Sequence, residues 1–509
     1  MLSSPREIRV LAVVGTGVMG QGIAQIAAQG GLEVRLFDAQ DGAAQRARDA
    51  LAATWARLEA RGSMDAAAVA AALQRVQVCT TLQALAGADL VVEAIAERLD
   101  AKQALFQQIE AVVGPDCVLA TNTSSLSVTA IASACTIPQR VAGWHFFNPV
   151  PRMKLVEVVQ GLRTDTAVVD TLLALGQHLG HRAVRAQDTP GFIVNHAGRG
   201  FGTEALRVLG ESVARPAVID DVLRAQAGFK LGPFELFDLV GLDVSVPVME
   251  SVYRQYFEEP RFRPSPLAVL RRHAGLLGRK SGTGFYTYVD GQAQKSPLPL
   301  PAAADPGPVW VSRRNAWGAA CADWLREGGA HVEEGARPSA QALCIVLPQG
   351  EDVSHCVAAE ALDGARTVAL DWLLPQIGCA ALFTNPLSTP QTVARAQALL
   401  GPLCAAVCVL RDSTGLLSQR VLATIVNIAC DMAQQGIASP QDIDAAVTLG
   451  LGYPQGPLAW GDALGPQCLL QILERLQALT GDPRYRPSPW LRRRALLGLS
   501  LLATEYPSH

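Results

Sequence analysis

The sequence predicts an α/β domain built on a doubly wound, largely parallel sheet, followed by an all-α domain, a degenerate α/β segment and a second copy of the all-α domain. Three observations support this prediction. Short apolar runs alternate with helical patterns over residues 1–187, as they do in doubly wound sheets. Long helical patterns without strand alternation begin at residue 188. Motifs of that helical part recur about 224 residues later, and recurrence at a fixed offset indicates duplication.

The strands of the first domain are predicted from apolar runs of strand length. These runs cover residues 8–14, 33–38, 76–80, 89–95, 117–122, 140–147 and 154–160. Helical patterns lie between them, including an alanine-rich stretch that extends to about residue 74 and another at residues 100–112. Only a short, proline-containing connection separates the last two runs, which lets those two strands lie side by side.

The rest of the chain is predicted from the repeat and from one composition change. Gly232-Pro233 recurs as Gly456-Pro457, and the run PRFRPSP at 260–266 recurs as PRYRPSP at 483–489. Five prolines between residues 297 and 308 indicate a semi-extended linker. Strand candidates in the segment that follows lie at 342–348, 366–373 and 380–386. The predicted divisions are therefore 1–187, a first helical copy at 188–290, a linker at 291–308, a degenerate α/β segment at 309–412 and a second helical copy at 413–509.

The composition excludes several classes of protein. Forty-three basic and 46 acidic residues give a net charge of −3, which is a poor match for nucleic acid. No apolar run is long enough to span a membrane. The eleven cysteines form no CxxC pair, and the eight histidines show no metal-ligand spacing. We therefore expect a cytoplasmic globular protein that binds no nucleic acid, no membrane and no metal.

A glycine-rich loop follows the first predicted strand and begins a helix. In its G-x-G-x-x-G pattern, Gly15 permits a tight turn, Gly17 lets backbone N–H groups approach a pyrophosphate, and Gly20 allows close helix–strand packing. Asp38 ends the second predicted strand, where a carboxylate binds the ribose hydroxyls of NAD and repels the 2′-phosphate of NADP. The sequence therefore predicts an NAD site, and segment 309–412, which lacks such a loop, is expected to have lost its own. The predicted contacts of the loop are Gly15, Gly17, Val18, Met19 and Gly20.

A histidine and a glutamate lie on the two adjacent strands that end the first domain. His145 is near the end of the run 140–147, and Glu157 lies inside the apolar run 154–160. A carboxylate within an apolar strand needs a partner, and a histidine braced by a carboxylate acts as a general base. Oxidation of an alcohol by hydride transfer needs such a base for the hydroxyl proton. No GxSxG motif or Ser-His-Asp order is present, so hydrolysis is less favoured.

Seven motifs, in order and with their spacings, resemble the 3-hydroxyacyl-CoA dehydrogenase family. They are GTGVMGQGIA, LFD, VVEAIAE, TNTSS, HFFNPVPRMKLVEVV, DTPGFIVN and GRKSGTGFY, within residues 1–290. The duplicated helical part is similar to the longer bacterial members of the 3-hydroxybutyryl-CoA and 3-hydroxyadipyl-CoA dehydrogenase type. The resemblance implies NAD-dependent oxidation of an (S)-3-hydroxyacyl-CoA thioester, with the acyl-CoA as partner and NAD as cofactor.

The resemblance also implies a role for each matching residue. His145 becomes the base for the 3-hydroxyl and Glu157 its partner, while Ser124 and Asn195 hold the reacting oxygen of the substrate. Further implied contacts to NAD come from Glu97, Lys102, Asn122, Asn148 and Lys280, and implied contacts to the CoA thioester come from Ser124, Asn195, Arg57 and Lys102.

Two features depart from the family pattern. The serine and lysine that contact CoA in the family fall here on Ala50 and Arg57; Arg57 can still bind a phosphate, whereas Ala50 cannot form a hydrogen bond. In the second copy Gln419 takes the position of Asn195, and no histidine–glutamate pair corresponds to the first. A structural role is therefore expected for the second copy, either in a homodimer or by packing on the first copy as an intrachain pseudo-dimer.

Two other functions and the choice of acyl chain stay open at this stage. A 3-hydroxyacid dehydrogenase for free acids would use a lysine on the first helix of the helical domain, but DTPGFIVNHAGRG contains none. A non-catalytic, crystallin-like relative would not need Ser124, His145, Glu157 and Asn195 together. For a dicarboxylic substrate such as 3-hydroxyadipyl-CoA, Arg152 and Arg199 are candidate cations for the far carboxylate.

Overall fold

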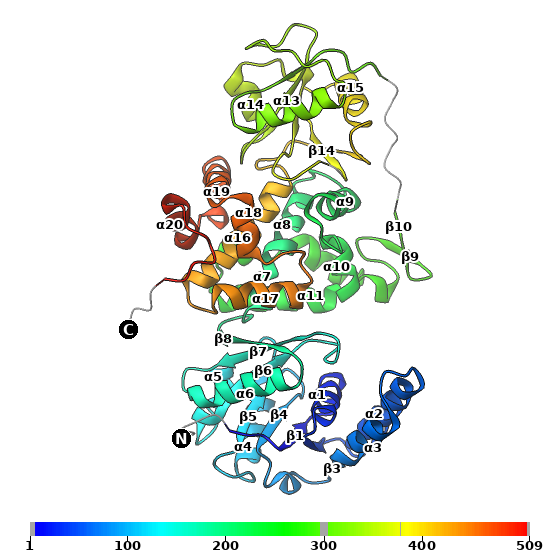
Figure 1. Cartoon of the computed structure of the whole chain (residues 1–509), viewed down its shortest axis with the longest axis vertical. Helices are drawn as coiled ribbons and strands as arrows, with labels where there is room; N and C mark the ends of the chain where they lie inside the picture. Colours follow the sequence, from blue (N-terminus) through cyan, green and yellow to red (C-terminus); the bar gives the residue numbers. More distant parts are fainter. Residues whose placement is uncertain (1–5, 296–303, 377, 506–509) are drawn as a thin grey trace. The chain divides into compact units, whose positions relative to one another are not determined.

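The computed structural model of the chain describes residues 6–295, 304–376 and 378–505 (Figure 1). These residues form two compact units. The first contains the chain up to His196 together with Gln435–Leu451, and the second contains Ala197–Gln434 and the chain from Gly452 onward. The units therefore interleave in the sequence, whereas the predicted divisions are consecutive.

The first unit is built on an eight-stranded sheet. Its strands are β1 (Val10–Val14), β2 (Glu33–Phe37), β3 (Val76–Val78), β4 (Leu90–Glu93), β5 (Val118–Thr121), β6 (Val141–Phe146), β7 (Leu155–Gln160) and β8 (Arg182–Gln187). They lie in the order β3-β2-β1-β4-β5-β6-β7-β8, and every pair is parallel except β6 with β7. The order reverses between β1 and β4, so the carboxyl ends of these two strands form a switch point, where α/β sheets bind ligands.

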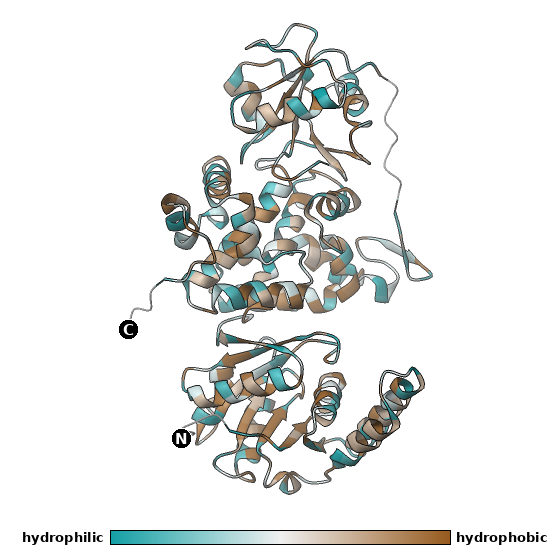
Figure 2. Ribbon diagram, viewed as in Figure 1, coloured by the Kyte–Doolittle hydropathy of each residue, from teal (hydrophilic) through white to brown (hydrophobic). Residues whose placement is uncertain are grey.

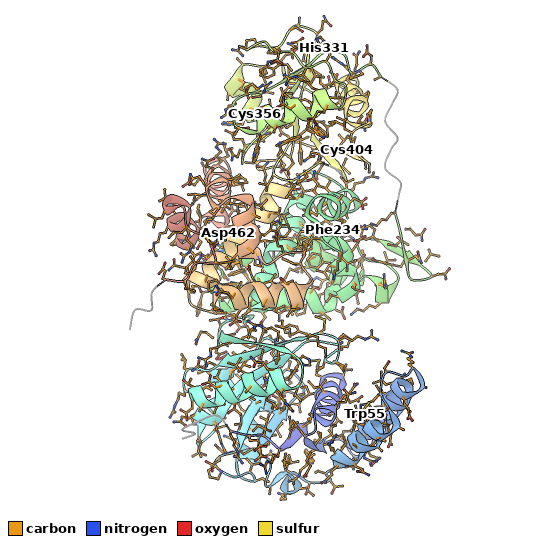
Figure 3. The ribbon with its side chains drawn as sticks, viewed as in Figure 1. Trp55, Phe234, His331, Cys356, Cys404 and Asp462 are labelled. Carbon is orange, nitrogen blue, oxygen red and sulfur yellow. The ribbon has the colours of Figure 1, made fainter. Side chains whose placement is uncertain are left out.

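Helices cover both faces of this sheet, as the predicted doubly wound fold requires. They are α1 (Val18–Gln29), α2 (Ala43–Ala60), α3 (Ala66–Arg75), α4 (Leu99–Glu110), α5 (Val128–Ala132), α6 (Thr166–His178), the short α7 (Val194–Ala197) and α17 (Pro440–Leu451). Side chains alternate along a strand: Leu11 and Val13 of β1 belong to one core, whereas Ala12 and Val14 belong to the other. Trp55 of α2, labelled in Figure 3, is fully buried in the first of these cores.

The second unit contains the helices of both copies apart from α7 and α17. The first copy supplies α8 (Arg199–Gly210), α9 (Pro216–Ala227), α10 (Pro233–Val240), α11 (Leu242–Gln255), α12 (Pro266–His273) and a hairpin of β9 (Thr287–Val289) with β10 (Gln292–Gln294); the second copy supplies α16 (Ser418–Gln434), α18 (Pro457–Leu464), α19 (Pro466–Thr480) and α20 (Pro489–Leu497). The helices α8 and α16 pack against each other. A Cβ on Gly200 would lie only 3.1 Å from the Cα of Ile425, so glycine permits this close contact between the copies.

An aspartate that recurs in the repeat accepts backbone hydrogen bonds in each helical copy. Asp238 accepts hydrogen bonds from the backbone N–H groups of Phe285 (2.8 Å) and Tyr286 (2.9 Å). Asp462, labelled in Figure 3, accepts one from the backbone of Leu501 at 2.7 Å. Each carboxylate thus holds the chain that ends its copy, which explains why this residue recurs in the repeat.

The second α/β segment forms a five-stranded sheet within the second unit. Its strands are β11 (Val309–Val311), β12 (Leu343–Val346), β13 (Thr367–Leu370), β14 (Ala380–Phe383) and β15 (Val407–Leu410), with helices α13 (Trp317–Glu327), α14 (Val353–Glu360) and α15 (Pro390–Leu400). Pairing along the order β11-β12-β13-β14-β15 is parallel, parallel, antiparallel and parallel. The order β4-β5-β6-β7-β8 has the same pattern. The described part of this segment therefore repeats five strands of the first sheet and lacks counterparts of β1, β2 and β3. The strands of both sheets are largely hydrophobic in Figure 2.

The predicted fold class is confirmed by this architecture, but five of the described strands were not predicted as elements of their own. They are β8, the hairpin strands β9 and β10, β11 and β15. Two arginines interrupt the apolar pattern of β8 (Arg182 and Arg185), and β10 and β11 have only three residues each. Such segments form strands because neighbouring strands pair with them, which a single-sequence pattern does not record.

Candidate active site

The glycine loop after β1 has the geometry that a bound pyrophosphate needs. Gly15 has a φ of +94°, and a Cβ there would lie 2.6 Å from the carbonyl oxygen of Ala94. At Gly20 a Cβ would lie 1.9 Å from the oxygen of Gly15. Within the described residues a Cβ on Gly17 would meet nothing within 4 Å, so the fold alone does not require glycine there. A phosphate at the N-terminus of α1 would require it, since its oxygens approach these backbone N–H groups.

Asp38 follows β2 beside this loop. Its carboxylate accepts hydrogen bonds from the backbone N–H of Thr16 at 2.7 Å, the Thr16 hydroxyl at 2.8 Å and the Gln40 N–H at 3.0 Å. Although partial burial acts to raise it, these hydrogen bonds hold the pKa of Asp38 below its usual value. The ionised carboxylate is thus fixed at the end of the strand where a ribose would lie in a Rossmann-type domain.

His145 and Glu157 form a buried pair on the antiparallel strands β6 and β7. The register places them directly opposite each other, and Nδ1 of His145 lies 2.6 Å from Oε2 of Glu157. Glu157 is fully buried and His145 is 5% exposed. The other carboxylate oxygen accepts hydrogen bonds from the backbone N–H groups of Ile193 (3.0 Å) and Val194 (2.9 Å), at the start of α7.

This arrangement orients the imidazole for proton transfer. With Nδ1–H donated to Glu157, the lone pair of Nε2 is available to a reacting group. No residue in the described part of the chain forms a hydrogen bond with Nε2. The ring packs against Phe147, with centroids 4.4 Å apart, and against Phe192 at 5.8 Å. The pair can therefore accept a proton from a hydroxyl and stabilise the imidazolium that results.

Polar groups from β5 and α7 gather beside this pair. The side-chain nitrogen of Asn195 donates to the carbonyl oxygen of Ser124 at 3.3 Å. Asn122 accepts a hydrogen bond from the backbone N–H of Phe146 at 2.9 Å, which places it next to His145 in the sheet. Asn148 is exposed and precedes a cis peptide bond to Pro149. The structure thus brings Ser124 and Asn195 together at the end of the sheet that holds the imidazole.

Glu97 and Lys102 belong to a chain of ionised groups that reaches Ser124. Oε1 of Glu97 accepts hydrogen bonds from the backbone N–H of Ser124 at 2.9 Å and from its hydroxyl at 3.4 Å. Nζ of Lys102 lies 3.3 Å from Glu97 and 2.6 Å from Glu93, and Lys102 is only 1% exposed. Although burial acts to raise it, Lys102 and the hydrogen bonds hold the pKa of Glu97 below its usual value. Lys102 therefore lies against two carboxylates and can order Glu97.

Arg57, a predicted CoA contact, lies on α2, and Lys280, a predicted NAD contact, lies in the second unit. Arg57 is exposed and donates hydrogen bonds to the hydroxyl of Thr54 (3.0 Å) and the carbonyl of Ala53 (3.3 Å), while Ala50 is exposed about two turns earlier on α2. Lys280 belongs to the second unit, where its Nζ pairs with Asp243 at 2.8 Å.

Sequence reasoning missed two residues that order the site. Glu93 ends β4 fully buried, with Lys102 on one oxygen and the Thr121 hydroxyl, 2.7 Å away, on the other. Asp188 accepts hydrogen bonds from the backbone N–H groups of Val128 (2.9 Å) and Thr129 (2.7 Å), at the start of α5. Glu93 had the same signal as Glu157, an acid within an apolar strand. Asp188 begins the motif DTPGFIVN, but its contacts with the start of α5 depend on the tertiary fold.

The second half repeats the strand pair and the helix start that hold the dyad, but its described part has no counterpart of the His145–Glu157 pair. Asp371 directly follows β13, and its backbone N–H donates to the carbonyl of Ala381 on β14 at 3.3 Å, at the place where the first sheet has His145 opposite Glu157. It accepts hydrogen bonds from the backbone N–H groups of Leu417 (3.2 Å) and Ser418 (2.6 Å). Gln419 fills the remaining space, since its amide binds Asp371 at 3.1 Å and the carbonyl of Pro348 at 3.0 Å. This half therefore has a capping carboxylate in place of a base.

Membrane-spanning helices and metal-binding clusters are both absent from the part of the chain that the structure describes. No helix among them is both long and apolar enough to cross a membrane, and no group of three or more His, Cys, Asp or Glu side chains among them could hold a metal ion.

Two family models match the chain. A family model described as the NAD binding domain of 3-hydroxyacyl-CoA dehydrogenase matches residues 10–189, and the model of its C-terminal domain matches residues 191–288 and again 415–502. The chain is 42% identical to 3-hydroxyadipyl-CoA dehydrogenase of Escherichia coli K12 over 96% of this chain and 98% of that protein. It is 40% identical to a probable 3-hydroxybutyryl-CoA dehydrogenase of Bacillus subtilis over 55% of this chain and 98% of that one.

A solved structure covers both halves as well. The crystal structure of a 3-hydroxybutyryl-CoA dehydrogenase from Escherichia coli K12 matches with a TM-score of 0.86 at 39% identity, and the match covers 97% of this chain and 99% of that one. Both copies of the helical domain and the second α/β segment therefore lie within the similarity.

Proposed function

The chain belongs to the 3-hydroxyacyl-CoA dehydrogenase family, and from this premise we propose that His145 and Glu157 form the general base of its reaction, the NAD-dependent oxidation of 3-hydroxyacyl-CoA thioesters. The observation that supports this assignment is the buried 2.6 Å contact between the two side chains at the end of the sheet. A positioned base of this kind contributes a factor of about 10²–10⁴ to the rate.

In the proposed mechanism the hydroxyl proton and the C3 hydrogen leave in opposite directions. The hydroxyl proton passes to Nε2 of His145, and Glu157 stabilises the imidazolium through Nδ1–H. The C3 hydrogen would leave as hydride, for which NAD would supply the acceptor when bound, and the product would be a 3-oxoacyl-CoA. Ser124 and Asn195 donate hydrogen bonds to the substrate oxygens, while Glu97, ordered by Lys102, fixes Ser124. Asp38 and the backbone of Gly15–Gly20 hold the ribose and pyrophosphate.

The remaining predicted contacts complete this proposal. Asn122, Asn148 and Lys280 are proposed to lie near the bound NAD, and Arg57 is proposed to bind a phosphate of CoA. We place the protein in the cytoplasm because all eleven cysteines are free thiols. The packing of α8 on α16 supports an intrachain pseudo-dimer of the helical copies.

For the acyl group we propose 3-hydroxyadipyl-CoA. The relative with this substrate in its name matches 96% of this chain, including both helical copies. Arg152, exposed on the connection between β6 and β7, offers a cation for a second carboxylate. Arg199 is an alternative cation, although burial lowers its pKa to about 10.

Steady-state kinetics on a panel of thioesters test both the proposed reaction and the proposed acyl preference. NADH formation should be observed with (S)-3-hydroxyadipyl-CoA and (S)-3-hydroxybutyryl-CoA, with the higher kcat/KM for the adipyl substrate. A higher kcat/KM for the butyryl substrate would contradict the acyl preference alone. Activity confined to free 3-hydroxyacids, or no NADH with any thioester, would contradict the proposed function.

A further inference from the structure

A backbone hydrogen bond joins the last strand of each large sheet to the segment that precedes a helix. We call each of these two places a junction, and the two junctions can be compared with each other. In the first unit the backbone N–H of Gln187, at the end of β8, donates to the carbonyl of Ile437 before α17 at 2.8 Å. In the second unit the N–H of Arg411, after β15, donates to the carbonyl of Val213 before α9 at 2.9 Å. Each residue of the second pair is the repeat counterpart of one in the first.

The junction in the first unit is bridged by charge and by packing. Arg182 pairs with Asp442 at 2.9 Å. A Cβ on Gly450 of α17 would lie 2.8 Å from Val194 and 3.0 Å from Leu155, so the helix is in close contact with the sheet.

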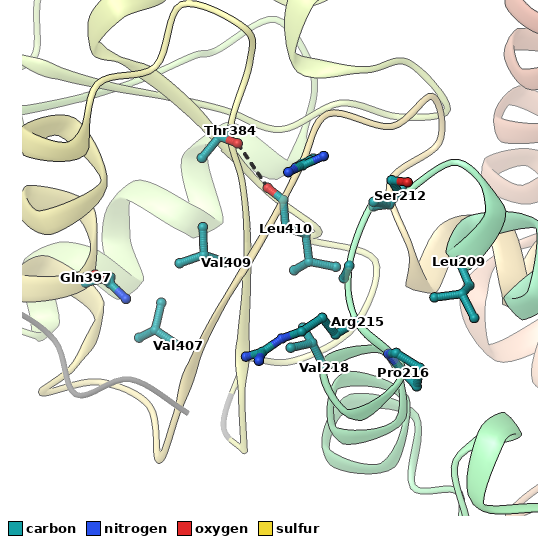
Figure 4. Close-up of a pocket in the computed structure, with 13 residues that line it drawn as sticks. Leu209, Ser212, Arg215, Pro216, Val218, Thr384, Gln397, Val407, Val409 and Leu410 are labelled. Carbon is teal, nitrogen blue, oxygen red and sulfur yellow. Dashed lines mark hydrogen bonds between the residues drawn. The ribbon is translucent and has the colours of Figure 1, made fainter. Parts of the chain in front are cut away.

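The junction in the second unit instead surrounds a cavity of about 620 Å³ (Figure 4). One wall comes from the connection of α8 to α9, with Val213 and Val218, and the other comes from β15 and α15, with Val407 and Val409. Figure 4 shows the Arg215 side chain extending between these walls. A volume of this size is within the range that small organic ligands occupy.

Positive charge lines this cavity without a counter-charge. Arg215 and Arg411 are both exposed lining residues, and no acidic residue lines the cavity. Neither guanidinium forms an ion pair or a hydrogen bond with any residue that the structure describes. Their counterparts in the other junction are Ser439 and Gln187. Both charges are therefore particular to the junction that contains the cavity.

A buried amide also lies on the wall without a partner. Gln397 of α15 is 9% exposed and lines the cavity, and its side chain forms no hydrogen bond within the described residues. The polar atoms of this amide are not among the fully buried, unpaired ones, so the amide is open to the cavity and can bind a molecule there. The N-terminus of α9, a helix of twelve residues, faces the same space without a side-chain cap, and its N–H groups favour an anion.

We propose that this cavity is a binding site for an aliphatic carboxylate, separate from the active site. The valine walls would take the alkyl chain. Arg215, Arg411 and the Gln397 amide would bind the carboxylate, since guanidinium–carboxylate contacts are strong and planar. Such a site would let free acids of the same chemical class as the acyl groups bind to the half of the chain that has no base.

Isothermal titration with decanoate on the full-length protein tests this proposal. Saturating acetoacetyl-CoA is present throughout, so that the active site is occupied. We expect saturable binding of one decanoate per chain, and binding of 1-decanol, which lacks the charge, weaker by about tenfold or more. Binding of the two compounds with equal affinity, or no saturable binding of decanoate, would overturn the proposal.

Variants locate the site. Arg215→Gln with Arg411→Gln should weaken decanoate binding about tenfold, which corresponds to about 1.4 kcal/mol, and Gln397→Leu should weaken it several-fold. The matched control removes two exposed arginines elsewhere, Arg163→Gln with Arg493→Gln, and should leave affinity unchanged. If the double variant is unstable, Ala214→Trp, which fills the cavity from its rim, should abolish binding. Unchanged affinity in Ala214→Trp and the site variants would refute the location, whatever their dehydrogenase activity.

Discussion

Glu157 organises the site because its two carboxylate oxygens bind different groups. One oxygen orients the imidazole of His145, and the other accepts two backbone N–H groups at the start of α7. The second half keeps only the latter task, since Asp371 binds the corresponding N–H groups with no imidazole opposite it. The second half therefore has a carboxylate that binds the start of the following helix, although no imidazole lies opposite it.

Asp220 gives a residue-scale prediction about pH. It is fully buried and accepts hydrogen bonds from the Tyr286 hydroxyl and the backbone N–H groups of Phe234 and Glu235. Burial outweighs these bonds and raises its pKa from 3.8 to about 7. Between these values the unfolded chain binds fewer protons than the folded one, so the contribution of Asp220 to the free energy of unfolding falls as pH rises.

Asp220→Asn removes this ionisation. Its melting temperature relative to the unaltered protein should therefore rise between pH 5 and pH 7, with the exposed Asp41→Asn as control. Circular dichroism melts at the two pH values measure this difference. A relative melting temperature that is constant or falls over this range would contradict the assignment.

Residue types in apolar strands made much of the site predictable. Glu157 stood out because a carboxylate inside an apolar strand needs a partner, and His145 because it lies on the adjacent strand. Asp38 was predicted from its place at the end of the strand that follows the glycine loop and its helix. The burial of Lys102 between Glu93 and Glu97 was not predictable, because those contacts depend on β4 and α4 packing together. The roles of Ser124 and Asn195 came from the family resemblance alone.

At the scale of elements, one helix of the second copy supports the catalytic strand. The helix α17 packs against β7 and β8, and its Gly450 lies against Leu155 of β7 and against Val194, whose N–H binds Glu157. Glycine at this position lets the helix approach the strand that holds the dyad.

Gly450→Val should disturb this support. A Cβ would already lie 2.8 Å from Val194, so we expect displacement of the Val194 N–H and a several-fold fall in kcat with little change in the KM for NAD. Leu449→Val on the exposed face of the same helix controls for helix propensity. Equal kcat values for Gly450→Val and Leu449→Val would contradict a supporting role for α17.

At the scale of the molecule, a buried ionic cluster joins the two helical copies. Glu204 of α8 is fully buried, with Arg420 of α16 at 2.7 Å, Arg484 at 3.5 Å and the Tyr485 hydroxyl at 2.7 Å. Although burial acts to raise it, the two arginines hold the pKa of Glu204 below its usual value. The repeat itself was visible in the sequence, but the interleaving of α17 with the first unit was not, since only tertiary packing selects which sheet a helix contacts.

Arg420→Leu should destabilise the protein strongly, by about 3 kcal/mol, because it leaves a buried carboxylate without its nearest partner. Glu204→Leu combined with Arg420→Leu removes both charges and should recover most of this loss. Calorimetric melting of the two variants, with the exposed Arg493→Leu as control, measures the difference. A double variant less stable than the single one would show that the pair does not behave as a coupled unit.

Turnover of His145→Gln tests the account most directly. With (S)-3-hydroxybutyryl-CoA and NAD, kcat should fall by about 10²–10⁴, while the dissociation constant for NAD, measured separately, stays within a factor of about two because His145 lies outside the glycine loop. A kcat equal to that of the unaltered enzyme, with the variant folded and NAD bound, would contradict the assignment of His145 as the base.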